Sequence, residues 1–406
     1  MRDIDLFQQA LGLVAPWYVE RAEFDATKRR LDLYLNFERG GTFRCPECGQ
    51  GDCKAHDTTE KTWRHLNFFE HEAHLHARTP RVACARCGVK AVEVPWARSG
   101  SGFTLMFEAI VLMLVKEMPV AAAARLLGEN DMRLWRIIHH YVDTAPAQVD
   151  LSEVRHVGVD ETASKRGHNY ISLFVDLEGP RVLFATEGRD AGTVAAFRAD
   201  LEARGGKAEQ IEEFCLDMSP AYLKGIAESF PQARITFDKF HVMKLLNDAV
   251  DQVRREEQRQ RPELKGSRYV WVKNPENLTQ TQLALLDGLD VPKLNLKTAR
   301  AYQMRLTFQE LWSMRDEIAE AFLKRWYFWA THSRLEPMIQ VARTVRRHWD
   351  GVLNWFCTRI SNGILEGINS LLQAARAKAR GYRTERNFIA MAYLIAGKLN
   401  LQLLPI

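Results

Sequence analysis

Hydrophobic and polar positions follow different patterns in successive parts of the chain. Strand-like alternation runs from Leu31 to Leu35 and again around residues 71–82. Residues 103–144 follow a helical pattern that Gly128 interrupts. Strand patterns dominate from about residue 154, and the stretch from about 239 to 350 is almost wholly helical and heavily charged. A last helix is expected to begin near Ser361, followed by an apolar segment that packs on the rest of the protein.

The strand-rich region has an informative order of elements. A helix from about Thr193 to Ala203 separates a first group of strands from a second group, and each strand of the second group is followed by a helix. Such an order predicts the α/β class with a mixed sheet. The expected strands, in chain order, read HVGVD, YISLFVDLE, RVLFATEG, IEEFCLD and ARITFD.

Composition narrows the function only a little. The chain has 406 residues, of which 46% are hydrophobic and 26% charged, so a folded protein of two to four domains is expected. A net charge of +5 leans only mildly toward polyanionic partners. The N-terminus lacks the features of a secretion signal, and the apolar stretch 103–115 is too short to cross a bilayer. We therefore expect a cytoplasmic protein without a membrane partner.

Two aspartates follow apolar strands in the α/β region. Asp160 ends the apolar run Val157–Val159, and Asp217 ends the run Phe214–Leu216. An aspartate at the end of one strand is ordinarily a turn former or a helix cap. Two of them on strands expected to be neighbours would instead bring carboxylates together, as two-metal phosphoryl transfer requires. Mg²⁺ keeps several waters, so three acids suffice to hold it.

Glu366 is the third candidate carboxylate and lies in the stretch SNGILEGIN. Ser361 or Asn362 can cap a helix there, and an acid in a first turn is favoured by the helix dipole, so an ordinary capped helix is one interpretation. However, glycines flank the acid where alanine would make a better helix. Helical spacing places five residues on one face, which begins with a possible metal ligand and ends with guanidinium groups. They are Glu366, Asn369, Gln373, Arg376 and Arg380.

Asp238 and His241 compete with the second aspartate. Asp238 ends the fifth expected strand and opens the stretch DKFH. His241 would contact the scissile phosphate or protonate a leaving oxygen, although a capping aspartate with a buried histidine is an equally good interpretation. Glu161 adjoins Asp160 but alternation turns it to the other face. Asp217 is the preferred ligand, with Asp238 as an accessory candidate.

Cysteine pairs near the N-terminus indicate structural zinc. Cys45 with Cys48, and Cys84 with Cys87, form two C-x-x-C-G knuckles. The chain contains seven cysteines, an odd number that argues against a disulfide framework. The gap between the knuckles is long enough to require an inserted β-hairpin or more. In a less favoured alternative, one thiolate is replaced by a ligand from the pair Cys53 and His56.

Two helical segments carry further candidates for DNA contact. A helix from Pro119, a turn at Gly128 and a helix over 131–142 are typical of a helix-turn-helix whose second helix enters a major groove, with Arg133 and Arg136 on it. A plain helical hairpin is the alternative. The aromatic stretch 326–329 is interpreted as the core of its own helical region, and stacking on a flipped base is the alternative.

Four motifs occur in an order that resembles the bacterial insertion-sequence transposases of the ISL3 family. They are VDET, LDMSPAY, TFDKFH and SNGILEGINSLLQAARAKARGYR. The resemblance covers most of the chain. It implies a DDE transposase with a ribonuclease-H-like core, in which Asp160, Asp217 and Glu366 hold two Mg²⁺ or Mn²⁺ ions. It also implies a nucleoid-associated protein that binds double-stranded DNA as a homodimer. The candidate DNA-binding residues are Arg133, Arg136, Asn369, Arg376, Lys378 and Arg380.

The expected organisation follows from these assignments. The ribonuclease-H-like core would be interrupted by an all-helical insertion and preceded by a zinc-binding β module and a helix-turn-helix. The predicted domains are 1–96 for zinc, 97–148 for the helix-turn-helix, 149–242 with 351–406 for the core, and 243–350 for the insertion. Two other functions remain open: a nuclease of the same fold acting on branched DNA without strand transfer, and a domesticated DNA-binding regulator that has lost catalysis.

Overall fold

The computed structural model describes residues 3–165, 169–289, 296–360 and 363–401. The chain divides into two compact units, one of residues 1–141 with 400–406 and the other of residues 142–399. Ser361 and Asn362, the predicted caps of the last helix, lie outside the described residues. The two units are described separately below.

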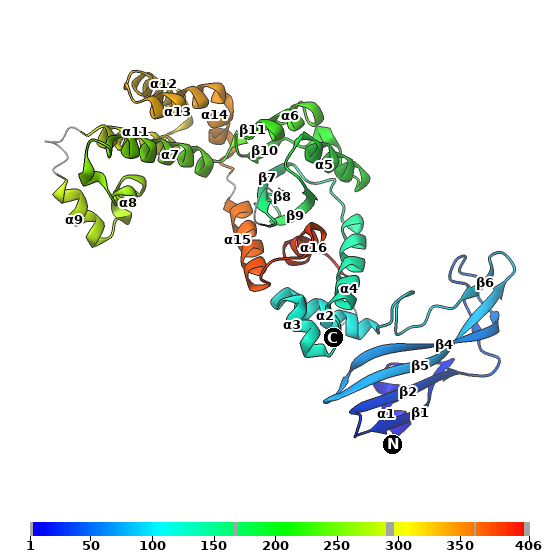
Figure 1. The fold of residues 1–406 in the computed structure, drawn as a ribbon. Helices are drawn as coiled ribbons and strands as arrows, with labels where there is room; N and C mark the ends of the chain where they lie inside the picture. The colour runs from blue at the N-terminus through cyan, green and yellow to red at the C-terminus, as the bar shows by residue number, and fades with distance from the viewer. Residues whose placement is uncertain (1–2, 166–168, 290–295, 361–362, 402–406) are drawn as a thin grey trace. The chain divides into compact units, whose positions relative to one another are not determined.

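A six-stranded sheet forms the N-terminal part of the first unit (Figure 1). The strands follow the order β1-β2-β5-β4-β3, with β6 paired to β5. Leu33 and Leu75 are buried in its core together with Trp63, which explains the alternation in the sequence. The strands predicted around 31–35 and 71–82 are confirmed as β2 and β5. The elements are α1 (Asp3–Ala10), β1 (Trp17–Asp25), β2 (Arg30–Phe37), β3 (Thr42–Phe43), β4 (Cys53–Phe68), β5 (His71–Cys84) and β6 (Gly88–Ala91).

Three helices complete this part of the chain: α2 (Leu105–Glu117), α3 (Val120–Leu127) and α4 (Asp131–Thr144). The Thr104 hydroxyl caps α2 by accepting a hydrogen bond from the backbone N–H of Phe107. Gly128 ends α3 with a φ of 68°, a left-handed conformation that glycine adopts at little cost. The predicted break at Gly128 and the helix after it are thus confirmed.

A five-stranded mixed sheet is the centre of the second unit. Its order is β11-β10-β7-β8-β9, in which β7, β8 and β9 are antiparallel neighbours and β10 and β11 run parallel to β7. The first and fourth strands of the region are therefore neighbours, as predicted. The strands are β7 (His156–Ala163), β8 (Tyr170–Asp176), β9 (Arg181–Glu187), β10 (Glu213–Leu216) and β11 (Arg234–Phe237).

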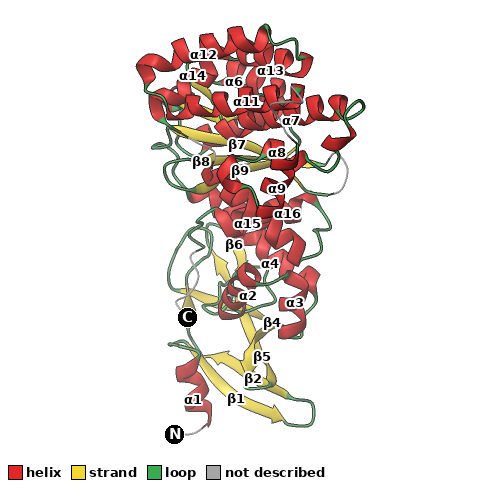
Figure 2. Cartoon of the chain, turned by 90° about the vertical axis from the view of Figure 1, so that its left-hand side faces the viewer, coloured by secondary structure: helices red, strands yellow, loops and turns green. Residues whose placement is uncertain are grey.

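Helices cover both faces of this sheet (Figure 2). Val157 and Val159 of β7 pack in one core with residues of α5 (Ala191–Ala203) and α6 (Pro220–Ser229). On the other face, α15 (Gly363–Lys378) contacts β7 and α16 (Glu385–Ala396) contacts β9. The Tyr393 hydroxyl of α16 accepts a hydrogen bond from the backbone N–H of Ala185 at 3.0 Å. The apolar segment after the last predicted helix is therefore α16, packed on the sheet.

The predicted helical stretch after β11 is confirmed. Its core is built around the buried side chains of Trp271, Phe308 and Trp326. The predicted limits of the insertion, at residues 243 and 350, fall inside helices that begin or end beside the sheet. The helices are α7 (Lys239–Glu257), α8 (Arg268–Val272), α9 (Gln280–Gly288), α11 (Lys297–Glu310), α12 (Asp316–Thr331), α13 (Glu336–Arg347) and α14 (Trp349–Thr358). Among the described helices, none is long and apolar enough to cross a membrane.

The aromatic stretch on α12 divides between the core and the surface. Trp326 is buried, and its Nε1 donates a hydrogen bond to the Met304 carbonyl at 2.9 Å. Phe328 and Trp329 are instead 64% and 39% exposed. The interpretation of 326–329 as core is therefore wrong for these two residues, because helical geometry turns only part of a four-residue run inward.

Candidate metal centres and DNA-binding surfaces

Three aspartates lie toward the C-terminal ends of the parallel strands β7, β10 and β11. Asp217 follows directly after β10, and Asp238 follows directly after β11. Asp160 lies within β7 rather than at its end, so that part of the prediction is wrong. The strand continues because β8 pairs with it as far as Ala163. Its parallel neighbour β10 stops at Leu216, so the sheet opens beside Asp160 on that side only. We call Asp160, Asp217 and Asp238 the acidic edge.

The strand register places the first two aspartates side by side. Cys215 of β10 pairs with Gly158 of β7. Asp217 and Asp160 each follow two residues later, so both return to the face of their register partners. That face is the one covered by α15, because Val157 and Val159 point to the opposite core. As predicted, Glu161 alternates to the other face, where the structure places it 3.4 Å from Arg189.

The Asp160 side chain is half-buried among other charged groups. Burial raises its pKa to about 6, while a hydrogen bond from the Glu161 backbone N–H and the nearby His241 act in the opposite direction. The charge of Asp217 adds to the rise, which places the two acids in the same electrostatic environment. Asn369 of α15 donates from Nδ2 to Asp160 Oδ2 at 2.8 Å. A raised carboxyl pKa at a site lined by acids is typical of a functional centre.

Asp238 and His241 form a pair at the start of α7. Asp238 is 4% exposed, and its Oδ2 lies 3.1 Å from Nδ1 of His241. This hydrogen bond raises the pKa of His241, and the charges of Asp160 and Asp217 raise it further. Asp217, by contrast, accepts a hydrogen bond from the backbone N–H of Ser219 at 2.9 Å. The acidic edge is therefore one coupled set of charges with an imidazole facing it.

Glu366 stands in the first turn of α15 with an exposed side chain. It precedes Asn369 by three residues, so both project from one side of the helix. Within the described residues, only a cysteine set brings three or more metal-ligand side chains within 4.8 Å of one another. That set does not include Asp160, Asp217 or Glu366.

Contacts near the end of β7 anchor α15. Gln373 donates from Nε2 to Thr162 Oγ1 at 2.5 Å and to the Ala163 carbonyl at 3.2 Å. The Arg376 guanidinium also donates to the Ala163 carbonyl, so it is held by the protein. The helix ends at Lys378, and Arg380 follows with a φ of 58°. The prediction that Arg380 shares the helical face is therefore wrong, because the chain leaves the helix before it.

Tyr222 is a site residue that sequence reasoning missed. Its ring is 1% exposed, and its hydroxyl shares a hydrogen bond with Ser172 at 2.7 Å. Burial raises its pKa, the hydrogen bond with Ser172 lowers it, and the charge of Glu161 raises it more than those of Asp217 and Asp160, so the ring lies on the face of β7 that carries Glu161. The available signal was its place in LDMSPAY, five residues after Asp217.

The predicted cysteine site is assembled in the first unit. The sulfurs of Cys45, Cys48, Cys84 and Cys87 all lie within 4.8 Å of one another. Cys48 Sγ and Cys84 Sγ are 3.5 Å apart. Tetrahedral zinc with bonds of about 2.3 Å would place sulfurs about 3.8 Å apart. Hydrogen bonds from the backbone N–H groups of Arg86 and Cys87 lower the pKa of Cys84 to about 6, which favours the thiolate that binds metal. The residues present therefore fit structural Zn²⁺.

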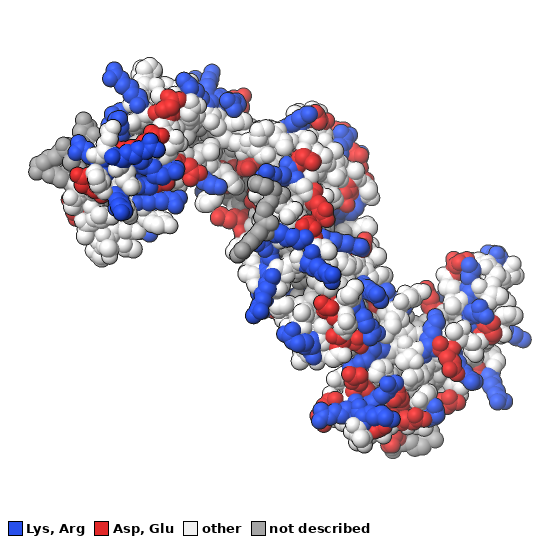
Figure 3. Space-filling model, viewed as in Figure 1, with Lys and Arg blue, Asp and Glu red and all other residues white. Residues whose placement is uncertain are grey.

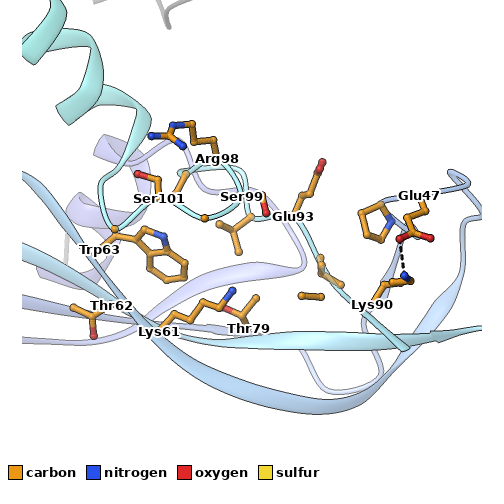
Figure 4. Close-up of a pocket in the computed structure, with 17 residues that line it drawn as sticks. Glu47, Lys61, Thr62, Trp63, Thr79, Lys90, Glu93, Arg98, Ser99 and Ser101 are labelled. Atoms are coloured by element: carbon orange, nitrogen blue, oxygen red, sulfur yellow. Dashed lines mark ion pairs between the residues drawn. The ribbon is translucent and has the colours of Figure 1, made fainter. Parts of the chain in front are cut away.

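Elements around the cysteines explain the spacing. The hairpin β4–β5 lies between the two knuckles, which confirms the predicted insertion. The alternative pair, Cys53 and His56, lies outside the cysteine set. An ion pair between Glu47 of the first knuckle and Lys90 of β6 joins the two sides, beside a pocket of about 700 Å³ (Figure 4).

Helix α4 carries the basic residues predicted to contact DNA. Arg136 is exposed on it. Arg133 is held by the protein, since it lies 2.6 Å from Glu129 and stacks 4.2 Å over the Phe103 ring. Of the two predicted arginines, Arg136 is the more accessible to a phosphate.

Comparisons with known proteins define the class and then the family. A zinc finger of insertion-sequence transposases matches residues 41–87, a helix-turn-helix domain of transposase family ISL3 matches 92–142, and the ISL3 transposase domain matches 157–392. Together they define a transposase with a zinc ribbon and a helix-turn-helix. Because the transposase domain matches more than half of the chain, the chain belongs to the ISL3 family. The predicted resemblance is confirmed.

Two relatives are similar to this chain over nearly its whole length. The transposase for insertion sequence element IS1557 of Mycobacterium tuberculosis is 28% identical over 97% of this chain and 96% of its own length. The transposase for insertion sequence element IS1001 of Bordetella parapertussis is 28% identical over 94% of this chain and 95% of its own length.

Proposed function

We propose that the chain binds the terminal inverted repeats of its insertion sequence, cleaves the ends and joins their 3′-hydroxyl groups to target DNA. The acidic edge is the observation that carries this proposal. The strand order β9-β8-β7-β10-β11, with the first three antiparallel, supports a ribonuclease-H-like core. The helices from α7 to α14 would be its insertion.

Asp160, Asp217 and Glu366 are proposed to hold a pair of Mg²⁺ or Mn²⁺ ions. When bound, such a pair would stabilise the attacking and leaving oxygens of an in-line displacement. Asp217 is preferred to Asp238 because Asp238 is buried and bonded to His241. Asn369 orients Asp160 through its amide, and Tyr222 closes the back of the site against water.

His241 is proposed to act on the leaving oxygen. Its pKa is raised by Asp238 and by the neighbouring acids, so the imidazolium is populated closer to neutral pH. A protonated imidazole facing the acidic edge can donate a proton to the 3′ oxygen that leaves. Asp238 would keep the ring in position throughout.

Double-stranded DNA is the proposed partner of both units. The zinc ribbon and α4 would read the inverted repeats, with Arg136 on a phosphate or a base edge. The exposed Lys378 and Arg380 would contact the backbone near the cut. A homodimer is proposed because both ends must be joined in one event. The domain limits given above are proposed as the units of this division of labour.

Incubation of the full chain with end DNA and Mg²⁺ tests the function. We expect nicks at the element ends followed by joined products. Asp160→Asn and Glu366→Gln should lower the cleavage rate by at least about 1,000-fold, as loss of an essential charged group does. Glu161→Gln is the matched control. Glu161 lies on the other face of the strand, so this variant should cut at the wild-type rate.

Other outcomes would overturn parts of the proposal. Unchanged cleavage by Asp160→Asn would refute the assignment of the metal ligands. Nicks without joined products would favour a nuclease that lacks strand transfer. Binding of the ends without any cutting by the wild type would favour a regulator.

A further inference from the structure

A groove lies between α7 and α8, next to the acidic edge. Its volume is about 420 Å³, within the range of small-molecule sites. Four of its residues belong to one face of α7, since they are spaced by four, seven and eight positions. We call it the α7–α8 groove, and its lining residues are Phe240, Lys244, Asn247, Asp248, Arg268 and Val272.

An aromatic ring stands at the end of the groove nearest the acidic edge. Phe240 directly precedes His241, and their ring centroids are 5.8 Å apart. Phe240 lies in the first turn of α7, and its ring is 55% exposed, so it is not part of the core. An exposed phenylalanine beside the half-buried His241 offers a flat apolar surface to whatever approaches the acids.

Two cations also line the groove. Lys244 and Arg268 are both exposed. Arg268 lies 3.7 Å from Asp251, a distance that leaves its guanidinium able to donate elsewhere. Figure 3 shows Lys and Arg side chains gathered over the region of α7, α8 and α11. Asp248 is the one acid in the lining, so the groove has excess positive charge.

Asn247 has a fixed orientation within the groove. Arg305 is buried and donates from Nε to Asn247 Oδ1 at 3.0 Å. A guanidinium has no acceptor, so the amide atom that it contacts must be the oxygen. The Nδ2 group of Asn247 is thereby fixed as a donor on the remaining side. An oriented amide donor beside a carboxylate can meet the acceptors and donors on the edge of a nucleobase.

We propose that the α7–α8 groove receives one unpaired nucleotide of the element end, adjacent to the phosphate that is cut. The base stacks on Phe240, and the flanking phosphate is bound by Lys244 and Arg268. Asn247 and Asp248 meet the edge of the base. The proposal rests on the proposed function and adds to it that the end must open locally before the acids reach the phosphate.

Cleavage of paired and mismatched ends tests the groove. Phe240→Ala should cut a fully paired end about 5- to 100-fold more slowly, the loss expected from removing one stacking contact. A mismatch at the nucleotide beside the cut removes most of the opening cost, so the same variant should come within about threefold of wild type on that duplex. Phe240→Trp should keep wild-type rates. A merely structural role for Phe240 would leave both duplexes equally affected.

Phe328→Ala is the matched control, since Phe328 is an exposed phenylalanine on α12 in the same helical region. It should cut both duplexes normally. The proposal is wrong if Phe240→Ala matches wild type on the paired end, if the mismatch gives no rescue, or if Phe328→Ala carries the defect instead. Failure of the proposed function looks different, because wild type would then cut neither duplex.

Discussion

The ionised Asp160 carboxylate has an unfavourable environment that a bound cation would relieve. Asp160 is half-buried near Asp217, and desolvation raises its pKa to about 6. An acid with a raised folded pKa destabilises the fold above that pKa and has no such effect below its ordinary pKa, near 4. The ionised carboxylate therefore lowers the stability of the fold, and the proposed divalent metal would offset this loss.

Replacement of Asp160 by asparagine should stabilise the protein while abolishing cleavage. Without divalent metal, the free energy of unfolding should rise by about 1–3 kcal/mol at about pH 7.5, because the buried charge is gone. The gain should shrink as pH falls from about 6 to about 4, where wild-type Asp160 is protonated. Urea denaturation of wild type and variant at about pH 7.5 and at about pH 4 measures the difference in free energy of unfolding. An equal gain at both pH values would contradict the assigned shift.

Asn369 offers a second test at the scale of one side chain. Asn369→Ala removes the donor to Asp160 and should lower the affinity for Mg²⁺ by about 10- to 100-fold, as for other groups that orient ligands. The Mg²⁺ dependence of cleavage measures this effect. High Mg²⁺ should restore most of the rate. If the rate falls without any change in Mg²⁺ dependence, Asn369 acts in another way.

Single residues also mark the limit of prediction from the sequence. Asp217 and Asp238 were found because each ends an apolar run, which is a local signal. The pairing of Asn369 with Asp160 joins positions 209 residues apart, so no local pattern contains it. The interior position of Asp160 in β7 was missed because it depends on how far β8 pairs with that strand.

At the scale of elements, α15 sets the position of Glu366. Gln373 fixes this helix to the end of β7. Gln373→Ala should therefore lower cleavage by up to about 100-fold, because a shift of about 1 Å in a catalytic group is enough for such a loss. Ser370→Ala, an exposed position of the same helix, is the control. Binding of end DNA should not change in either variant, as a gel-shift titration would measure.

The cysteine knuckles make a comparable prediction for the first unit. Cys45→Ser with Cys48→Ser should remove zinc, because two ligands cannot hold it in a tetrahedral site. End-DNA binding should fall with the metal content, which elemental analysis measures. Retention of both zinc and binding would contradict the four-cysteine site. Cys357→Ser, at an exposed cysteine on α14, is the control.

Elements were predicted from the sequence more successfully than their limits. The knuckles and the turn at Gly128 have local chemical signatures, and both are confirmed. The limits of the helical region have none, because α7 starts directly after β11 and α14 packs back on that strand. Gly351 shows how close this packing is, since an added Cβ would lie 2.3 Å from the Phe237 ring. Such an approach is not visible in a hydrophobic pattern.

On the scale of the whole molecule, the matches to known domains follow one another along the chain. The zinc-finger match ends at residue 87 and the helix-turn-helix match at residue 142, whereas the transposase match begins at residue 157. The sequence predicted this order from cysteines, a turn glycine and strand patterns. It did not predict that 142–399 forms one compact unit, because the core and its insertion differ in pattern but share their packing.

The position of α15 has a consequence for synthesis. Asp160, Asp217 and Asp238 leave the ribosome well before Glu366, and every helix from α7 to α14 is made between them. A chain that stops anywhere in this interval would carry both DNA-reading modules without the last carboxylate. On the proposed function, such a fragment would occupy an element end without cutting it. An interrupted gene would then yield an inhibitor of its intact copies rather than a silent product.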